Sequence, residues 1–215
     1  MILGQLQTLL NDLYALEIAY DVNDFLITDA QLASRLDAGG RCVDEKLLIA
    51  EEADTASVSL YLEKNLMDRL QNNNPAQRLD EENLQDFWKA LEGVSHFTYY
   101  AWNAQVEKSV TLLEMELQAE VDKFVATIVL LQEQGRNASP RLHHWLFDLA
   151  RFDERLSDEE LTRYQDANHY AAKYCRKIAP QLKAWCAGGE LNRELCEFYR
   201  LTQPGKIRHI EAARA

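Results

Sequence analysis

Glycine and proline are both scarce in this chain, which has 8 glycines and 4 prolines among its 215 residues. Sheet-rich proteins need many tight turns, and tight turns consume these two residue types. Hydrophobic residues make up 47% of the chain and charged residues 27%, the balance of a folded protein and not of a disordered one. We therefore predict an all-α fold, an irregular multi-helix bundle of about seven to nine helices.

Paired cysteines are absent. The four cysteines, Cys42, Cys175, Cys186 and Cys196, form no Cys-x-x-Cys pair, and their spacing matches no common zinc signature. A small secreted scaffold would contain cysteine at a higher density. We therefore expect reduced thiols and a cytoplasmic location.

The chain has fewer basic residues than acidic ones, and its formal net charge is −12. So acidic a surface repels the phosphate backbone, which argues against sequence-independent binding of nucleic acid. The acidity itself has two interpretations, solubility or the attraction of a basic partner or of cations, and we favour solubility. The chain also has no basic N-terminal region and no uncharged apolar run of about 18 residues, so we expect neither a signal peptide nor a membrane span.

Common catalytic motifs are missing as well. No serine lies in a Gly-x-Ser-x-Gly turn, and no glycine-rich phosphate loop is present. The cysteine with the most cationic neighbours is Cys175, beside Arg176 and Lys177, and that setting is too weak to indicate a nucleophile. These absences favour a protein without catalytic activity.

Apolar residues recur at steps of three and four in several segments, which is the spacing of one helix face. The predicted helices cover residues 2–20, 29–36, 59–70, 80–107, 112–134, 143–152, 157–178 and 191–201. Residues 43–49 are ambiguous between a helix start and a strand, and residues 57–62 alternate in polarity as a short strand does. Potential capping boxes begin at Thr28, Thr111 and Ser157.

We predict a single helical domain over residues 1–203. The clearest loop is 72–75, with the sequence Asn-Asn-Asn-Pro, so a subdomain boundary, if there is one, lies near residues 72–79. Residues 204–215 form a basic C-terminal tail. We expect this tail to be a frayed terminus or a strap across the acidic bundle, in preference to a docking peptide.

The central segment, residues 84–131, holds the most unusual polar residues, and they suggest a metal site. Glutamate, aspartate and histidine recur at i and i+4, which places both members of a pair on one helix face. The three pairs are Glu92 with His96, Glu116 with Glu120, and His144 with Asp148. Carboxylates and imidazoles that converge from several helices build di-iron and di-manganese centres, and such ligands suit iron, manganese or zinc.

Two observations oppose this hypothesis. The Glu-x-x-His spacing typical of di-iron bundles is absent, because three residues separate Glu92 from His96. The acids also have basic residues nearby with which to form ion pairs: Lys89, Lys108, Lys123 and Arg151. We therefore favour ion pairing over a metal or catalytic site, and expect no cofactor unless that metal hypothesis holds.

Aromatic residues gather on the first central helix: Phe97, Tyr99, Tyr100 and Trp102. Tyrosine and tryptophan are common in interfaces, and residues 113–131 carry a heptad-like apolar seam. The favoured function is therefore a helical module that binds a protein partner or itself through this aromatic face. The alternatives are a carboxylate/histidine metal-binding bundle and a small-ligand pocket lined by the aromatic residues.

Overall fold

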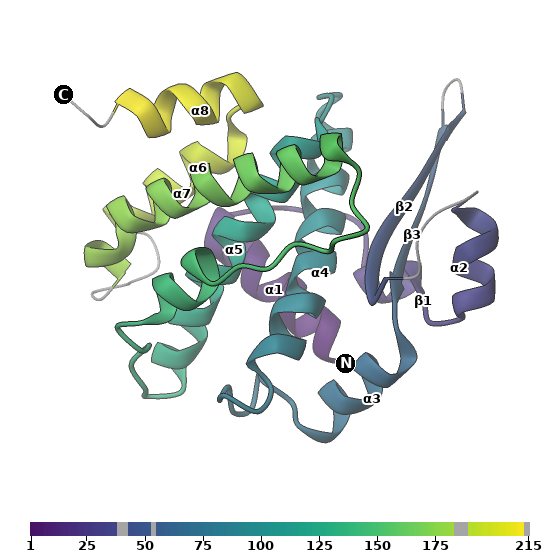
Figure 1. Ribbon diagram of the computed structural model, residues 1–215, viewed down its shortest axis with the longest axis horizontal. Helices are drawn as coiled ribbons and strands as arrows, with labels where there is room; N and C mark the ends of the chain where they lie inside the picture. The colour runs from purple at the N-terminus through teal and green to yellow at the C-terminus, as the bar shows by residue number, and fades with distance from the viewer. Residues whose placement is uncertain (38–42, 53–54, 183–188, 213–215) are drawn as a thin grey trace.

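The computed structural model describes residues 1–37, 43–52, 55–182 and 189–212. Within these ranges the chain is mostly helical, as predicted (Figure 1). The α-helices are α1 (Ile2–Tyr14), α2 (Ala30–Leu36), α3 (Lys64–Asn72), α4 (Leu84–Gln105), α5 (Leu112–Glu133), α6 (Asp158–Leu182), α7 (Glu190–Arg200) and α8 (Gln203–Ala212). A 3-10 turn, η1 (Val22–Phe25), and a π-helical turn, η2 (His144–Asp148), complete the helical elements.

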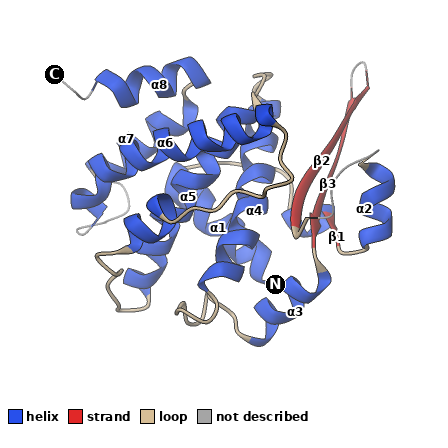
Figure 2. Cartoon of the chain, viewed as in Figure 1, coloured by secondary structure: helices blue, strands red, loops and turns tan. Residues whose placement is uncertain are grey.

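A small sheet departs from the all-α prediction. Its strands are β1 (Leu26–Ile27), β2 (Glu45–Glu52) and β3 (Thr55–Leu62), in the order β1-β3-β2. β2 and β3 form an antiparallel hairpin in which Leu47 pairs with Leu60, and β1 lies parallel to β3. The sheet stands at one side of the helices, with α2 on its outer face (Figure 2). Residues 59–62 are therefore strand, and the helix predicted from 59 begins only at Lys64.

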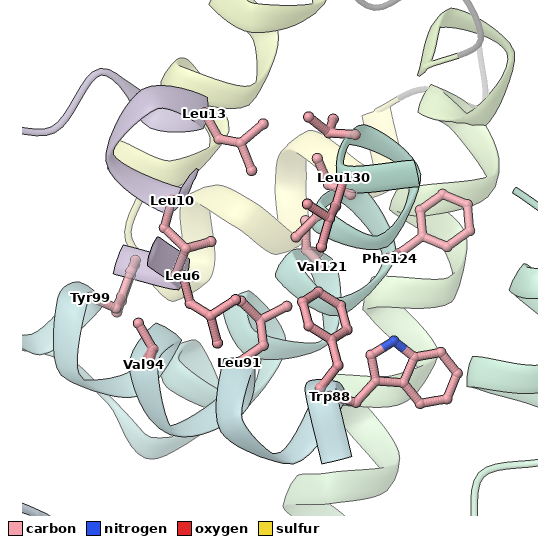
Figure 3. Packing of buried hydrophobic residues seen from close by; sticks show 14 of the residues in the cluster. Leu6, Leu10, Leu13, Trp88, Leu91, Val94, Tyr99, Val121, Phe124 and Leu130 are labelled. Atoms are coloured by element: carbon pink, nitrogen blue, oxygen red, sulfur yellow. The ribbon is translucent and has the colours of Figure 1, made fainter. Parts of the chain in front are cut away.

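The core lies where α1, α4 and α5 meet. α1 contributes a stripe of leucines at steps of three and four, and Leu6, Leu10 and Leu13 are each 1% exposed. These leucines face Leu91 and Val121 in the packed interior (Figure 3). α4 and α5 are buried on nearly every side, so any polar residue on them has to find a partner inside the protein.

Local capping sets several helix boundaries. Thr111 caps α5, with its hydroxyl accepting a hydrogen bond from the Glu114 amide at 3.1 Å. Ser157 and Glu160 form a reciprocal capping box ahead of α6, as predicted. Thr28 does not start α2; Asp29 caps it and accepts from the amides of residues 31 and 32. α1 ends at Tyr14, earlier than the predicted residue 20, because Ala15 adopts the left-handed conformation.

The basic C-terminal segment is helical. α8 packs on α6, and its Lys206 and Ile210 are 0% and 6% exposed. The predicted break at Gly188 lies outside the described residues, as do Cys42 and Cys186, whereas Cys175 and Cys196 are free thiols. None of the helices in the described ranges combines the length and the apolar run that a membrane span requires.

Candidate metal centre

Two glutamates and a histidine converge between α4 and α5. Glu92 and His96 lie one turn apart on α4, and Glu116 faces them from α5. One potential ligand atom from each residue falls within 4.8 Å of the others. His96 Nε2 lies 3.4 Å from a carboxylate oxygen of Glu116. The predicted Glu92–His96 pair is thus an interior feature, and Glu116 of the second predicted pair joins it.

His96 Nε2 has an unusual environment. The imidazole side chain is 8% exposed, and Nε2 is buried without a hydrogen-bond partner among the described residues. A buried polar atom without a partner carries a free-energy cost of about 1–3 kcal/mol. The Glu116 carboxylate, 3.4 Å away, offsets this cost only by charge and only while His96 is protonated, so a neutral His96 presents a ligand-type nitrogen whose bonding capacity is unused by the described residues.

Glu45 reaches the same histidine from the sheet. Its Oε1 lies 3.4 Å from His96 Nδ1, the other ring nitrogen. The Glu45 side chain reaches the histidine by passing directly over Gly93 of α4. If residue 93 had a Cβ atom, that atom would lie only 2.9 Å from Glu45 Cγ. A glycine inside a helix lowers stability by about 1 kcal/mol relative to alanine. The close approach of the β2–β3 hairpin explains why glycine is nevertheless found at position 93. Sequence reasoning missed Glu45 because it lies on the ambiguous segment 43–49, and Gly93 inside a predicted helix was the available signal.

Lys123 neutralises the remaining acid. Its ammonium lies 2.8 Å from Glu92 and 2.7 Å from Glu120. Glu120, a predicted ligand, is therefore engaged with Lys123, and the ligand group found in the described residues consists of Glu92, His96 and Glu116 without it. This ion pairing agrees with the favoured prediction for the acids, but it leaves Glu116 and His96 without a lysine or arginine partner among the residues described.

Burial and mutual charge shift the pKa values of the group. Burial lowers the pKa of His96, but the carboxylates of Glu116 and Glu45 outweigh it and hold the pKa well above its usual range. Burial raises the pKa of Glu45 despite the opposing effect of His96. Burial also raises the pKa of Glu92, but Lys123 and His96 outweigh it, and the net shift is downward. The two carboxylates that face His96 therefore stabilise the protonated form of its ring.

A pocket of about 740 Å³ opens beside the group. Glu45, Glu92, Glu120 and Lys123 contribute to its lining, while η2 and the segment 149–156 form the opposite wall. Figure 1 shows this segment crossing in front of α4 and α5 before it enters α6. Aromatic rings complete the lining: Trp88, Trp145, Phe152 and Tyr164. Its volume suits a small organic ligand.

The third predicted pair does not join the site. His144 Nδ1 lies 2.9 Å from Asp148, and both side chains are about half exposed, at 53% and 51%. They lie on η2 and pair with each other at the surface, because spacing at i and i+4 is the same on an exposed face as on a buried one. His144 and Asp148 are therefore not ligands of this centre.

The aromatic residues predicted to form an interaction face lie mostly inside the protein. Phe97 and Tyr99 are 2% and 0% exposed, and Tyr100 and Trp102 are half-buried. Tyr99 donates a hydrogen bond to Glu114 at 2.6 Å and packs edge-on against Tyr199. Tertiary packing therefore covers Phe97 and Tyr99, whereas Tyr100 and Trp102 remain partly exposed.

A second polar cluster surrounds Asp122 of α5. Asp122 is 0% exposed and accepts hydrogen bonds from Tyr14, from Ser95 at 2.5 Å and from Gln118 at 2.7 Å. Gln118 in turn accepts from Lys206 of α8, whose ammonium lies 4.3 Å from the ring centre of Phe198. Burial raises the pKa of Asp122 to about 6 and lowers the pKa of Lys206 to about 7.

No protein-family model matches the chain, and neither a curated protein nor a solved structure matches it. The functional argument therefore rests on the geometry of the site.

Proposed function

We propose that the protein binds one divalent transition-metal ion through Glu92, His96 and Glu116. The observation that carries the proposal is the buried Nε2 of His96, which has no hydrogen-bond partner and faces the Glu116 carboxylate. A bound ion would supply that partner. It would also offset the charge of Glu116, which has no lysine or arginine partner among the described residues, while Glu92 keeps its ion pair with Lys123.

The spacing suits such an ion. Two ligands on a tetrahedral ion with bonds of about 2.1 Å lie about 3.4 Å apart, which is the distance from His96 Nε2 to Glu116. All three ligand atoms lie within 4.8 Å of one another, so the widest separation has to close by at most about 1.4 Å for tetrahedral geometry. One imidazole with two carboxylates suits manganese, iron or zinc.

Three protein ligands leave a coordination position open, as in catalytic metal sites. Glu92 also lines the pocket of about 740 Å³, so a bound ion would lie next to that space. A water molecule or a small ligand would occupy the open position. The aromatic residues that the sequence suggested for a small-ligand pocket are not among those that line this one.

The proposal replaces the interaction module favoured on sequence grounds. That hypothesis needs an exposed aromatic face, whereas Phe97 and Tyr99 are packed in the core. The cytoplasmic location remains part of the proposal, supported by the free thiols of Cys175 and Cys196.

The test is direct metal binding. Protein purified without chelators should contain close to one equivalent of manganese, iron or zinc by elemental analysis, and apo protein should take up Mn²⁺ in an electron paramagnetic resonance titration. His96→Gln should weaken Mn²⁺ binding by at least about 100-fold, since losing even an outer-shell partner costs 10–100-fold.

His144→Gln is the matched control, because it makes the same change at a surface histidine paired with an aspartate. Equal effects of the two substitutions would overturn the proposal. So would wild-type protein that contains no metal and takes up no Mn²⁺, Fe²⁺ or Zn²⁺.

A further inference from the structure

The two nitrogens of His96 have different neighbours. Nδ1 contacts the Glu45 carboxylate at 3.4 Å, whereas Nε2 faces Glu116 and has no hydrogen-bond partner among the described residues. Metal-binding histidines commonly donate the N–H of one ring nitrogen to a carboxylate and bind the ion with the other. The ring of His96 has this division before any ion is present.

We infer that Glu45 is the positioning residue of the metal centre: its carboxylate holds the proton of His96 on Nδ1, so that Nε2 presents its lone pair to the ion. This inference rests on the proposed function and deepens it. Glu45 touches the histidine and not the ion, so it acts through the orientation, tautomer and basicity of the imidazole.

The fold places Glu45 beside His96 through close packing at Gly93 and burial of the Glu45 carboxylate. Gly93 leaves room for its side chain over α4, and the β2–β3 hairpin docks at the same place, with Leu60 also 2.9 Å from where a Cβ of residue 93 would be. Glu45 is 12% exposed, so its carboxylate is largely removed from water. A carboxylate is costly to bury unless it is hydrogen-bonded to a charged or polar partner, and His96 Nδ1, at 3.4 Å, is such a partner.

The neighbouring charged groups do not substitute for Glu45. Lys123 faces Glu92 and Glu120, and Lys89 pairs with Asp44. Tyr164 lies on the opposite wall, and its pKa is raised by burial and by the carboxylates of Glu116, Glu92 and Glu45. Among the groups the structure describes around the ring, Glu45 is therefore the acceptor within reach of Nδ1.

The role of Glu45 has two separable parts, the hydrogen bond and the charge. Glu45→Gln keeps an oxygen acceptor for the Nδ1 proton but removes the charge. Glu45→Ala removes both. We expect Mn²⁺ affinity at pH 8 to fall by about threefold to tenfold in Glu45→Gln and by about 10–100-fold in Glu45→Ala, the range for a lost outer-shell partner.

The pH profile distinguishes positioning from a general loss of structure. Because the Glu45 charge helps to hold the pKa of His96 high, Glu45→Gln should lower that pKa, which is measured by the ¹⁵N chemical shifts of the imidazole in apo protein. The pH above which Mn²⁺ affinity stops rising should move down with it. In apo wild type above that pKa, the same shifts should show the proton on Nδ1.

Asp44→Asn is the matched control. It lies one residue away, and its ion pair with Lys89 links it to the same helix without contact with His96. It should leave the pKa of His96 and the affinity for Mn²⁺ near wild-type values. The positioning role alone would be overturned if wild type and Glu45→Ala bound Mn²⁺ equally well. It would also be overturned if neutral His96 carried its proton on Nε2. Wild type that binds no metal would instead overturn the proposed function, and the tautomer measured in apo protein would still test the hydrogen bond.

Discussion

Gly93→Ala tests how the sheet helps to assemble the site. In an isolated helix this change is favourable by about 1 kcal/mol, because alanine is the better helix former. Here the new Cβ would lie 2.9 Å from Leu60 Cδ1 and 2.9 Å from Glu45 Cγ, closer than nonbonded carbons approach. Leu60 is 0% exposed, so it has no solvent to move into. Overpacking costs about 1–3 kcal/mol, and the net change should be a destabilisation of about 1 kcal/mol.

The assay is urea denaturation followed by tryptophan fluorescence, with Mn²⁺ affinity measured on the same variant. Affinity should fall by about tenfold, because displacing Glu45 disturbs its contact with His96. Leu60→Val provides the internal control, since it removes the Cδ1 atom that residue 93 would meet. Gly93→Ala should cost less in that background. A rise of about 1 kcal/mol in the stability of Gly93→Ala, the value for an unobstructed helix, would refute the close approach.

Three further predictions concern protons and the second polar cluster. The affinity for the metal ion should rise about tenfold per pH unit between pH 6 and 7, because the ion displaces the proton that Glu116 and Glu45 hold on His96. Titrations with Mn²⁺ at several pH values measure this slope. An affinity that does not change with pH would contradict the prediction. Burial lowers the pKa of Lys206 to about 7 in the folded protein, against 10.5 for an ordinary lysine, so the unfolded chain binds more protons between these two pH values. The free energy of unfolding should therefore rise by up to about 1 kcal/mol per pH unit from pH 7 to 9. Urea denaturation should show this slope in wild type and lose it in Lys206→Met. Tyr14→Phe should destabilise the protein by about 1–3 kcal/mol by removing a donor to buried Asp122, and an unchanged urea midpoint would exclude that contribution.

The helices were predictable because their signals are local. Residues 112–133 show the three-and-four spacing of apolar residues, and Thr111 provides the cap at the start. The end of α1 was not predictable from spacing, because apolar residues continue in step as far as Tyr20. The chain turns at Ala15 through a left-handed backbone conformation that an alanine does not signal.

The sequence indicated a short strand near residues 57–62 and left residues 43–49 ambiguous, but it did not predict the sheet, for a physical reason. β2 has the sequence Glu-Lys-Leu-Leu-Ile-Ala-Glu-Glu, which is rich in helix-forming residues. Its extended conformation comes from pairing with β3 and from docking across Gly93, contacts far away in sequence. Strand formation depends on such tertiary context more than helix formation does. Glu45, which depends on this docking, was out of reach of spacing arguments for the same reason.

Spacing found three pairs of potential ligands but could not separate interior from surface. Glu92 with His96 and His144 with Asp148 have the same separation along the chain. Their surroundings differ: α4 is enclosed by α1, α5 and the sheet, whereas η2 turns its pair outward. The aromatic residues around His96 carried the relevant information, because a helix that is apolar on every side is buried on every side.

The polar clusters around Asp122 and around His96 differ in how their buried acceptors and donors are paired, and this difference supports the metal-site proposal. Asp122 accepts three hydrogen bonds, and Gln118 both donates and accepts. Such a connected network specifies packing and ties α8 to α5 through Lys206. In the His96 cluster, Nε2 is buried without a hydrogen bond to the described residues, and the Glu116 carboxylate lies 3.4 Å away. A metal ion between these groups would give Nε2 the partner that it lacks, and this is the reason that the proposal places the ligand at His96 and not at Asp122.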